Sequence, residues 1–593
     1  MPDLHFTSAS ANADERAAID DALMGSDDIG RALVLPVLHA LHDRVGWISP
    51  GGVNYVGERL GVAPADVYGV ATFYAFFSTT PRAPRVVEVC DDIACLCAGA
   101  AELCKTLEAT IGPPGVASGN GATWLRSPCL GLCDRAPAAM IRRAGTTPSF
   151  GRIAPADATL VTAALASETP PDDGPPLVGG SPLRLLRRVG RVDPKSLDAY
   201  RGDGGYEGLR AALEMGPERV IAEITASNLL GRGGAAFPTG RKMHAVASAQ
   251  ARPHYLVCNA DESEPGTFKD RVLMECDPFA IVEAMTISAY AAGCELGFIY
   301  VRGEYPLAAE RLAGAIAAAH AAGLLGNDVM GAGVRFDVEI RRGAGAYICG
   351  EETALFNSIE GKRGEPRNKP PFPVEAGLFG KPTLVNNVET LANLPWILRE
   401  GGAAFAKIGT PGSTGTRLFC LSGAIERPGV YEVAHGTALG TLIEMAGGLP
   451  PNRRLQGMLL GGAAGTMGGL ELLEMPLTFE DARAAGATLG SGVVMLYDDR
   501  VDLTEILRRI ARFFRDESCG QCVPCRVGTV RQEEALERLS QGGSSVRRTL
   551  DLTLLDEIGA AMRDASICGL GQTAANAIDS ARKRLGCFPE SPS

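Results

Sequence analysis

The first 80 residues show apolar positions at helical spacing. The pattern is clear in VLPVLHALHDRVGWI (34–48), and Pro64 stands where a further helix can begin in GVAPADVYGVATFYAFF. From residue 81, short β-like runs such as RVVEVC and ATWLRSPC alternate with the helix-like AGAAELCKTLEATIG. We therefore expect a helical bundle over 1–80 and a compact α/β domain over 81–167.

The rest of the chain predicts four further segments. The stretch ETPPDDGPPLVGGSP is too rich in Pro, Gly and Asp to fold by itself, which predicts a linker over 168–203. Over 204–410, strands such as HYLVCNA alternate with Ala-rich helices, the pattern of an α/β sheet with helical crossovers. β-like runs predict a small α+β domain over 411–499, and helical spacing predicts a helical domain over 500–593. The expected fold class is multidomain α/β and α+β.

Composition excludes several classes of function. The chain has 593 residues, a net charge of -12 and no run of Lys or Arg, so an electrostatic grip on nucleic acid is not expected. The N-terminal sequence lacks the pattern of a signal peptide, and no stretch of about 18 apolar residues occurs, which argues against membrane insertion. The 16 cysteines favour metal or redox chemistry if the compartment is reducing, and we expect a cytoplasmic protein.

A first set of four cysteines follows two predicted strands, spaced C-x4-C and, after a long gap, C-x3-C. Two loops can therefore present four thiolates to one site, which is the ligand set of a 2Fe-2S cluster. Structural zinc is the alternative, although zinc sites favour C-x2-C spacings. The members of this set are Cys90, Cys95, Cys129 and Cys133.

A second set lies in ESCGQCVPCRVG, spaced C-x2-C-x2-C, with a distant fourth cysteine in SICGLG. Three thiolates in one tight loop and a remote fourth are the ligand pattern of a 4Fe-4S cluster. A zinc ribbon requires a second C-x2-C pair, which this region lacks. The members of this set are Cys519, Cys522, Cys525 and Cys568.

Three glycine-containing stretches concentrate further chemistry. GRGGAA (231–236) matches G-x-G-x-x-A, but a helix-like segment precedes it, so the usual dinucleotide-binding fingerprint is not supported. Its free backbone amides, beside basic residues, still suit a phosphate. NADESEPGTFKD (259–270) follows a strand end, and GAGAYICGEETALFNSIEGKRGEPRNKPPFP (343–373) combines glycine turns with carboxylates. Each carboxylate taken singly is expected to be a solvated surface charge, but their crowding favours a cofactor pocket.

These motifs resemble a known family. LGRGGAAFPTGRK, NADESEPGTFKDR, GAGAYICGEETAL, KPPFP, PTLVNNVETL, ESCGQCVPCRVG and SICGLG are similar to the NADH-binding flavoprotein subunit of respiratory complex I and its soluble relatives, over about residues 200 to 585. The first 165 residues resemble the thioredoxin-like 2Fe-2S subunit that pairs with it. The resemblance implies a Rossmann-like FMN domain, a β-grasp-like (SLBB) domain and a 4Fe-4S helical bundle, here fused with the thioredoxin-like domain.

The resemblance implies four cofactors: FMN, NAD, one 2Fe-2S cluster and one 4Fe-4S cluster. The residues implied to surround FMN are Gly231, Arg232, Gly233, Gly234, Lys242, Asn259, Asp261, Glu262, Ser263, Tyr347, Gly350, Glu351, Asn386, Asn387 and Thr390. Glu264 and Glu352 are implied to position the nicotinamide nucleotide, with Phe237, Lys369 and Phe372 at its adenosine end. No side chain is expected to act as a general acid or base, because positioning of nicotinamide against flavin suffices for hydride transfer.

Such fusions resemble the β subunit of NAD-dependent, molybdenum-containing formate dehydrogenase most closely. The implied partner is a catalytic subunit with molybdenum or tungsten and further iron-sulfur clusters, in a hetero-oligomer. A diaphorase subunit of an NAD-reducing hydrogenase and a complex I subunit are the alternatives within the family. A zinc protein with two structural sites and a nucleotide-sensing module are the alternatives outside it.

The chain departs from the family pattern at two positions. Ala236 replaces a glycine, which adds a methyl group where nucleotide and flavin approach each other, and Ala245 stands where several relatives have an aromatic residue. We expect weaker adenine stacking, by about 1 kcal/mol.

Ala245→Phe should restore that stacking. We expect a KM for NADH about fivefold lower, because about 1 kcal/mol of ring stacking is regained in the bound state. Steady-state kinetics measure the effect, and an unchanged KM would contradict the stacking argument.

Overall fold

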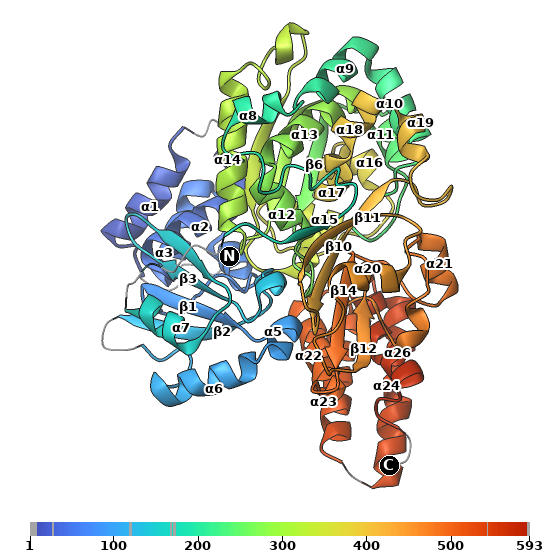
Figure 1. The fold of residues 1–593 in the computed structure, drawn as a ribbon. Helices are drawn as coiled ribbons and strands as arrows, with labels where there is room; N and C mark the ends of the chain where they lie inside the picture. Colours follow the sequence, from blue (N-terminus) through green and yellow to red (C-terminus); the bar gives the residue numbers. More distant parts are fainter. Residues whose placement is uncertain are drawn as a thin grey trace.

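The computed structural model describes residues 9–25, 29–117, 121–166, 169, 174–542 and 544–589. Residues 168 and 170–173 of the expected linker, and the ends 1–8 and 590–593 of the expected outer domains, lie outside the described residues. In Figure 1 the N-terminal part packs along one flank of the large central domain, and a helical hairpin near the C-terminus projects away from both. Within the described ranges, no helix is long and apolar enough to cross a membrane.

Four helices precede the first strand and form the N-terminal bundle. Ser49 caps the third of them, and proline occupies the first turn of the third and fourth, where a missing N–H is not needed. Apolar side chains from all four are buried in the same core. The helices are α1 (Ala13–Leu23), α2 (Val34–Val45), α3 (Pro50–Leu60) and α4 (Pro64–Ala71).

A four-stranded sheet of order β2-β1-β3-β4 follows the bundle. β1 (Arg85–Cys90) and β2 (Ala122–Ser127) are parallel, so the loops that follow them meet at one edge of the sheet. The first cysteine set lies at this edge: Cys90 ends β1, Cys95 lies in the short helix after it, and Cys129 and Cys133 follow β2. The other elements are β3 (Ala139–Arg143), β4 (Ser149–Ile153), α5 (Ile93–Cys97), α6 (Ala100–Thr110) and α7 (Ala158–Leu165).

The segment expected as a linker is structured from residue 178 onward. β5 (Val178–Gly180) pairs with β11 (Gly429–Ala434) and becomes the edge strand of a sheet formed far along the chain. The buried Glu432 carboxylate accepts the backbone N–H groups of residues 184–186. The stretch is too polar to fold alone, but from residue 178 onward it forms backbone hydrogen bonds to a distant strand. Residues 178–203 therefore differ from the expected linker.

The central domain contains a parallel sheet of order β8-β7-β6-β9. From β6 (His254–Ala260) the chain proceeds outward through β7 (Cys294–Val301) and β8 (Asp337–Arg342), then returns to the other side of β6 as β9 (Thr383–Asn387). This reversal creates a switch point at the carboxyl ends of β6 and β9, where α/β sheets bind ligands. The motif 259–270 begins at that edge.

Helices surround this sheet (Figure 1). The longest buried one, α13, begins with a proline and exposes almost no side chain, which suits an apolar helix packed on all sides. The helices are α8 (Leu197–Gly202), α9 (Glu207–Met215), α10 (Pro217–Ala226), α11 (Thr239–Ala247), α12 (Lys269–Cys276), α13 (Pro278–Ala292), α14 (Pro306–Ala321), α15 (Glu352–Ile359), α16 (Pro373–Ala376), α17 (Val388–Ala392), α18 (Leu394–Glu400) and α19 (Gly402–Ala406).

A six-stranded sheet of order β13-β12-β14-β10-β11-β5 forms the next domain. One face of this sheet covers a hydrophobic core that is separate from the core of the central domain. Phe419, Leu442 and Leu460 are buried in it. Besides β5 and β11, it contains β10 (Thr416–Gly423), β12 (Leu455–Leu460), β13 (Thr466–Gly468), β14 (Val493–Asp498), α20 (Leu439–Met445) and α21 (Phe479–Ala484).

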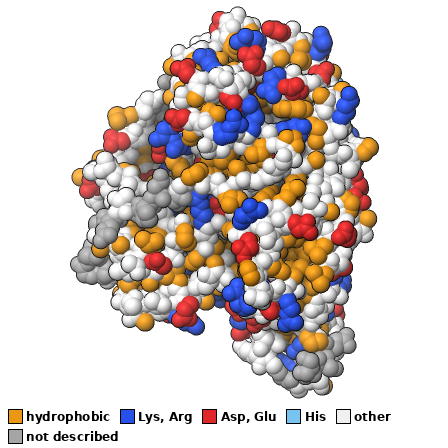
Figure 2. Space-filling model, viewed as in Figure 1, with side chains coloured by type: hydrophobic (Ala, Val, Ile, Leu, Met, Phe, Trp, Pro, Cys, Tyr) orange, Lys and Arg blue, Asp and Glu red, His pale blue; other side chains and the backbone are white. Residues whose placement is uncertain are grey.

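The C-terminal region is helical, and the expected fold class, multidomain α/β and α+β, is confirmed. Its helices are α22 (Leu503–Glu517), α23 (Val523–Ser540), α24 (Ser545–Ala565), α25 (Gly569–Thr573) and α26 (Asn576–Leu585). Figure 2 shows acidic and basic side chains interspersed over one face of the molecule.

Candidate functional site

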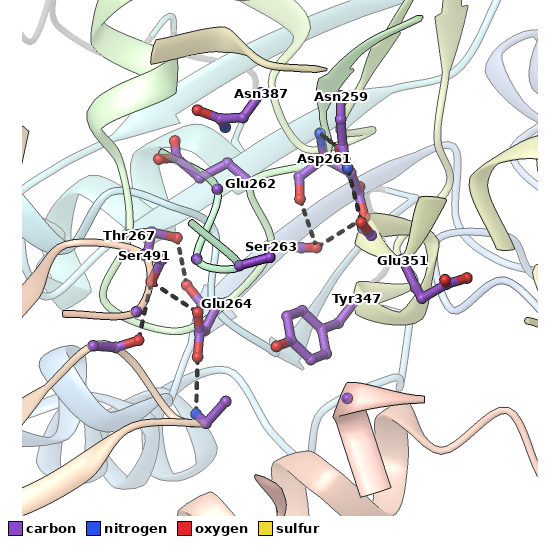
Figure 3. Close-up of a pocket in the computed structure, with 18 of the residues that line it drawn as sticks. Asn259, Asp261, Glu262, Ser263, Glu264, Thr267, Tyr347, Glu351, Asn387 and Ser491 are labelled. Atoms are coloured by element: carbon purple, nitrogen blue, oxygen red, sulfur yellow. Dashed lines mark hydrogen bonds between the residues drawn. The ribbon is translucent and has the colours of Figure 1, made fainter. Parts of the chain in front are cut away.

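A cavity of about 430 Å³ opens at the carboxyl ends of β6 and β9 (Figure 3). It lies at the switch point of the sheet, between the central domain, the β-grasp-like domain and the C-terminal helices. Twelve of the residues predicted from the sequence line it: Arg232, Gly233, Gly234, Asn259, Asp261, Glu262, Ser263, Glu264, Tyr347, Gly350, Glu351 and Asn387.

The glycine loop forms one wall without side chains. A Cβ atom at Gly233 would lie 3.1 Å from Cβ of Asn387, and Gly234 has a φ of +116°, which only glycine adopts readily. The backbone N–H of Arg232 donates to Oγ1 of Thr390 at 2.8 Å, which fixes the loop against α17. A planar group or a phosphate can therefore approach the loop backbone closely.

The two basic side chains beside this loop are held by backbone carbonyls. The Arg232 guanidinium donates to the carbonyls of Thr414 (2.7 Å) and Thr416 (3.1 Å), and burial lowers the Arg232 pKa to about 10. The Lys242 ammonium donates to the carbonyl of Val385 at 3.0 Å. The placement of both side chains near a phosphate stays a prediction; in the structure Arg232 holds the loop against residues 414–416, and Lys242 holds α11 against β9.

Glu262 and Glu264 of the acidic motif after β6 are buried, and their carboxylates accept hydrogen bonds. The Glu262 carboxylate accepts the N–H groups of Asp270 and Arg271 at 3.0 Å each, at the start of α12. The Glu264 carboxylate accepts the amide of Ala464 and the hydroxyl of Ser491, each at 2.8 Å. Burial raises the pKa of both carboxyls to about 7.

One buried donor at this edge has no protein partner. Asn386 is 5% exposed, and its Nδ2 makes no hydrogen bond to any residue that the structure describes. An unpaired buried N–H costs free energy, but Asn386 does not line the cavity, so this donor is no test of a ligand there. The two glycines of the loop and the cavity volume fit a flavin nucleotide.

Eight predicted residues do not line the cavity. Lys369 forms ion pairs with Glu351 (3.0 Å) and Glu352 (2.8 Å). Phe237 and Phe372 are 48% and 52% exposed, and their place at the adenosine end of a nucleotide stays a prediction. The eight residues are Gly231, Phe237, Lys242, Glu352, Lys369, Phe372, Asn386 and Thr390.

The cavity also has walls that the sequence did not predict. Two glycine-rich loops of the β-grasp-like domain, GGAAG (461–465) and TLGSG (488–492), face it, and so does the start of α25. Their glycine content was the one available signal, but nothing in the sequence places them next to a motif 200 residues earlier. The residues are Gly461, Ala464, Thr488, Gly490, Ser491, Gly569, Leu570 and Thr573, together with Thr267, Lys269 and Asp270 from the acidic motif.

The first cysteine set converges in the thioredoxin-like sheet. All four thiols are buried; Sγ of Cys129 lies 3.5 Å from Sγ of Cys133, and Cys90 contacts both Cys95 and Cys129. The N–H of Gly131 donates to Sγ of Cys129 at 3.4 Å, as loop amides do around cluster sulfurs. This donor set suits a 2Fe-2S cluster.

The loop of the first set is docked on the acidic motif. Arg302 donates to the carbonyl of Glu262 at 2.8 Å and also to the carbonyl of Cys129. Arg271 donates to the carbonyl of Gly131 at 2.9 Å and to Asp134 at 2.7 Å. Two buried guanidinium groups therefore connect the cavity to the first cysteine set.

The second cysteine set lines a small cavity of its own. Cys519, Cys522, Cys525 and Cys568 all face it, as do Ile348 and Leu570, which also line the larger cavity. The two cavities thus share a wall. Among the described residues, no three His, Cys, Asp or Glu side chains have the geometry that holds a single metal ion.

Comparison with protein families gives four matches along the chain. Residues 224–396 match the Nuo51 FMN-binding domain, and residues 22–159 match the thioredoxin-like 2Fe-2S ferredoxin family. Residues 505–586 match the iron-sulfur binding region of NADH-ubiquinone oxidoreductase-F, and residues 418–470 match the SLBB domain. The expected FMN, 2Fe-2S, SLBB and 4Fe-4S domains are confirmed.

Relatives of two kinds are similar to the chain. The F-type component 2 of the NADH-quinone oxidoreductase of Rhizobium meliloti is 46% identical over 68% of this chain and 95% of its own length. The alpha subunit of the NAD-reducing hydrogenase HoxS of Cupriavidus necator is 37% identical over 94% of this chain and 91% of its own length. A solved structure of an NAD+-reducing NiFe hydrogenase matches 96% of this chain and 94% of its own, with a TM-score of 0.80 and 32% identity.

Ala236 has a φ of +52°, in the left-handed region that costs an alanine about 1 kcal/mol. Ala236→Gly should therefore raise the free energy of unfolding by about 0.5 kcal/mol, after allowing for the greater freedom of unfolded glycine. Ala235→Gly is the matched control, because φ of Ala235 is not positive, and it should lower stability by a similar amount. Thermal unfolding measures both variants, and a shift of the same sign in both would contradict the strain argument.

Proposed function

Because the chain belongs to the family of NADH-dehydrogenase-module flavoproteins that includes the F-type component of NADH-quinone oxidoreductase and the alpha subunit of NAD-reducing hydrogenase, we propose that it transfers electrons between NAD(H) and two iron-sulfur clusters within a soluble hetero-oligomer. The chain is an oxidoreductase with FMN and iron-sulfur domains and NAD as its substrate. Its relatives are subunits of larger assemblies.

The shared wall between the two cavities carries this proposal. Ile348 and Leu570 each face both the flavin cavity and the second cysteine set, so few atoms separate the two sites. On the other side, Arg302 connects the Glu262 loop to the first set. The cavity therefore lies between the two cysteine sets, where a bound flavin would exchange electrons with clusters on both sides.

FMN bound in the cavity supplies the conversion between hydride transfer, which moves two electrons, and the one-electron chemistry of the clusters. The residues of the chain would bind the flavin and the nucleotide and orient them. The loop 231–236 offers amides to a phosphate, Asn259 ties the acidic motif to residue 350 by a 2.8 Å hydrogen bond to its carbonyl, and Tyr347 closes the cavity towards α22. Burial of this pocket excludes water, and no proton transfer by a side chain is required.

We further propose that the physiological partner is a formate-oxidising subunit with molybdenum or tungsten and further clusters, and that the assembly is cytoplasmic. Two observations support a soluble assembly of this type. The relatives from NADH-quinone oxidoreductase cover only 68% of the chain, whereas the thioredoxin-like part is fused here. Both cysteine sets are complete, and a reducing compartment keeps such thiols available for clusters. The formate branch itself rests on the sequence resemblance.

A hydrogen-oxidising partner is the second candidate. The hydrogenase alpha subunit and the solved hydrogenase structure both match along nearly the whole chain, thioredoxin-like part included. For either partner, the docking surface would adjoin the second cysteine set. Apolar side chains are exposed there: Val523 by 71%, Val527 by 48% and Ile567 by 39%. Exposed apolar side chains of this kind are typical of a surface that binds another protein.

The partner can be identified from the assembly that co-purifies with the chain under anaerobic conditions. Iron, FMN and molybdenum or tungsten, together with formate-driven reduction of NAD+, are the expected result. Nickel with hydrogen-driven reduction would replace the formate proposal by the second candidate, and absence of FMN and iron would refute both.

Cys522→Ala should stop electrons from leaving the flavin through the second cluster, because it removes one of the four cluster ligands. FMN should stay bound, because Cys522 does not line the larger cavity. We expect NADH-driven reduction of the native partner to fall about 100-fold or more. Cys587→Ala is the matched control, since Cys587 belongs to neither set. Flavin content and partner reduction are the measurements, and a normal rate in the Cys522 variant would show that the second cluster is not the route.

A further inference from the structure

Glu264 is the one predicted nucleotide-positioning residue whose carboxylate is held by another domain. Its Oε1 accepts the amide of Ala464, in the loop between β12 and β13, and its Oε2 accepts the hydroxyl of Ser491, in the loop before β14. Each hydrogen bond is 2.8 Å long, and the glutamate is 8% exposed. Figure 3 shows this carboxylate between Ser491 and Tyr347 at the floor of the cavity.

The backbone of the β-grasp-like domain restricts the position of the carboxylate. A Cβ atom on Gly462 would lie 2.3 Å from the carboxyl carbon of Glu264, so the loop packs directly on the acid. Thr267 donates to the Glu264 carbonyl at 2.8 Å and fixes the backbone below it. The side chain is therefore clamped from both ends, and the β-grasp-like domain supplies half of the clamp.

The hydroxyl of Ser491 has one hydrogen and two acceptors. Oε2 of Glu264 lies at 2.8 Å and the carbonyl of Gly461 at 3.2 Å. An ionised carboxylate is the stronger acceptor, so the hydrogen goes to Glu264 when that group carries its charge and is free to turn to Gly461 when it does not. Ser491 thereby favours the ionised form and its position.

We propose that Ser491, with the amide of Ala464, is a positioning residue that holds the Glu264 carboxylate in place for the nicotinamide end of the nucleotide. The β-grasp-like domain is then part of the NADH site and not only a spacer between the flavin domain and the cluster bundle. This inference rests on the proposed function, because it assigns Glu264 to nucleotide binding.

Seven other ionisable side chains line the cavity with Glu264: Arg232, Asp261, Glu262, Lys269, Asp270, Tyr347 and Glu351. Tyr347 faces it across the cavity, and Asp261 and Glu262 lie on its own loop. The loops 461–465 and 488–492 and the cavity-lining residues of α25 carry no ionisable side chain. Burial raises the pKa of Glu264 to about 7, and the hydrogen bonds from Ala464 and Ser491 oppose that rise. Loss of the hydroxyl therefore shifts the pKa of Glu264 further upward.

Ser491→Ala tests the positioning role. We expect the acid limb of the kcat/KM profile for NADH to move to higher pH by about one unit, and KM at pH 7 to rise about fivefold with kcat little changed. Calorimetric titration with NAD+ at several pH values should show the same shift without turnover. Ser491→Thr keeps the hydroxyl and should restore both quantities.

Ser422→Ala is the matched control. Ser422 is a fully buried serine of the same sheet whose hydroxyl has no partner among the described residues. Its removal should leave the pH profile and NAD+ binding unchanged. If Ser491→Ala and Ser422→Ala gave the same profile as the parent chain, the positioning role would be refuted.

A second variant covers the case in which Ser491→Ala does not fold. Glu264→Gln cannot ionise, so the acid limb should disappear and NAD+ affinity should become low at every pH. An acid limb that survives this change would overturn the proposal. Rapid NADH oxidation by the parent chain with ferricyanide as acceptor supports the proposed function independently. Its absence would refute that function, whereas normal oxidation with an unshifted limb refutes only the inference about Ser491.

Discussion

The buried carboxylate of Glu262 is the contact from which the rest of the site is arranged. It closes the turn between β6 and α12 by accepting two N–H groups of that helix, so the acidic motif has one conformation. Its own carbonyl accepts Arg302, which reaches the loop of the first cysteine set. A buried charge is stable only when its hydrogen bonds are satisfied; here the carboxylate is satisfied within the central domain, and Arg302 of the same domain carries the connection across the domain boundary to Cys129.

The same logic explains why the cavity needs several domains. The parallel sheet supplies the switch point, the glycine loop supplies backbone amides, and the β-grasp-like loops and α25 close the remaining sides. Electrons move between centres only over short distances, so centres in different domains require those domains to share walls. Ile348 and Leu570 are such a wall, because they belong to different domains and face both cavities.

The sequence predicts the individual domains and motifs better than it predicts the contacts between them. The fold class, the cofactor set and the family follow from motifs in which ligand spacing and glycine positions are constrained by chemistry. The sequence does not reveal that residues 178–180 complete a distant sheet, because a strand of three residues, Val-Gly-Gly, has no signature until its partner strand is known. It also misses Ser491 and Ala464, since a serine and an alanine carry chemistry only through where the fold places them. Arg232 and Lys242 are a related case, because the sequence gives no sign that both side chains donate to backbone carbonyls of distant segments.

The electrostatics of the cavity suit a site that passes electrons on. Its floor carries Asp261, Glu262 and Glu264, while the nearest ammonium, on Lys269, is already paired with Asp270 and Glu389. In a pocket of low dielectric constant, nearby negative charge makes each added electron cost more free energy, which favours transfer to the clusters over storage at the flavin. Burial weakens that effect by raising the pKa of Glu262 and Glu264 to about 7, so that a proton can neutralise either group. The donors on Ala464 and Ser491 oppose this neutralisation at Glu264, and their hydrogen bonds therefore favour a negative charge on that one carboxyl near neutral pH.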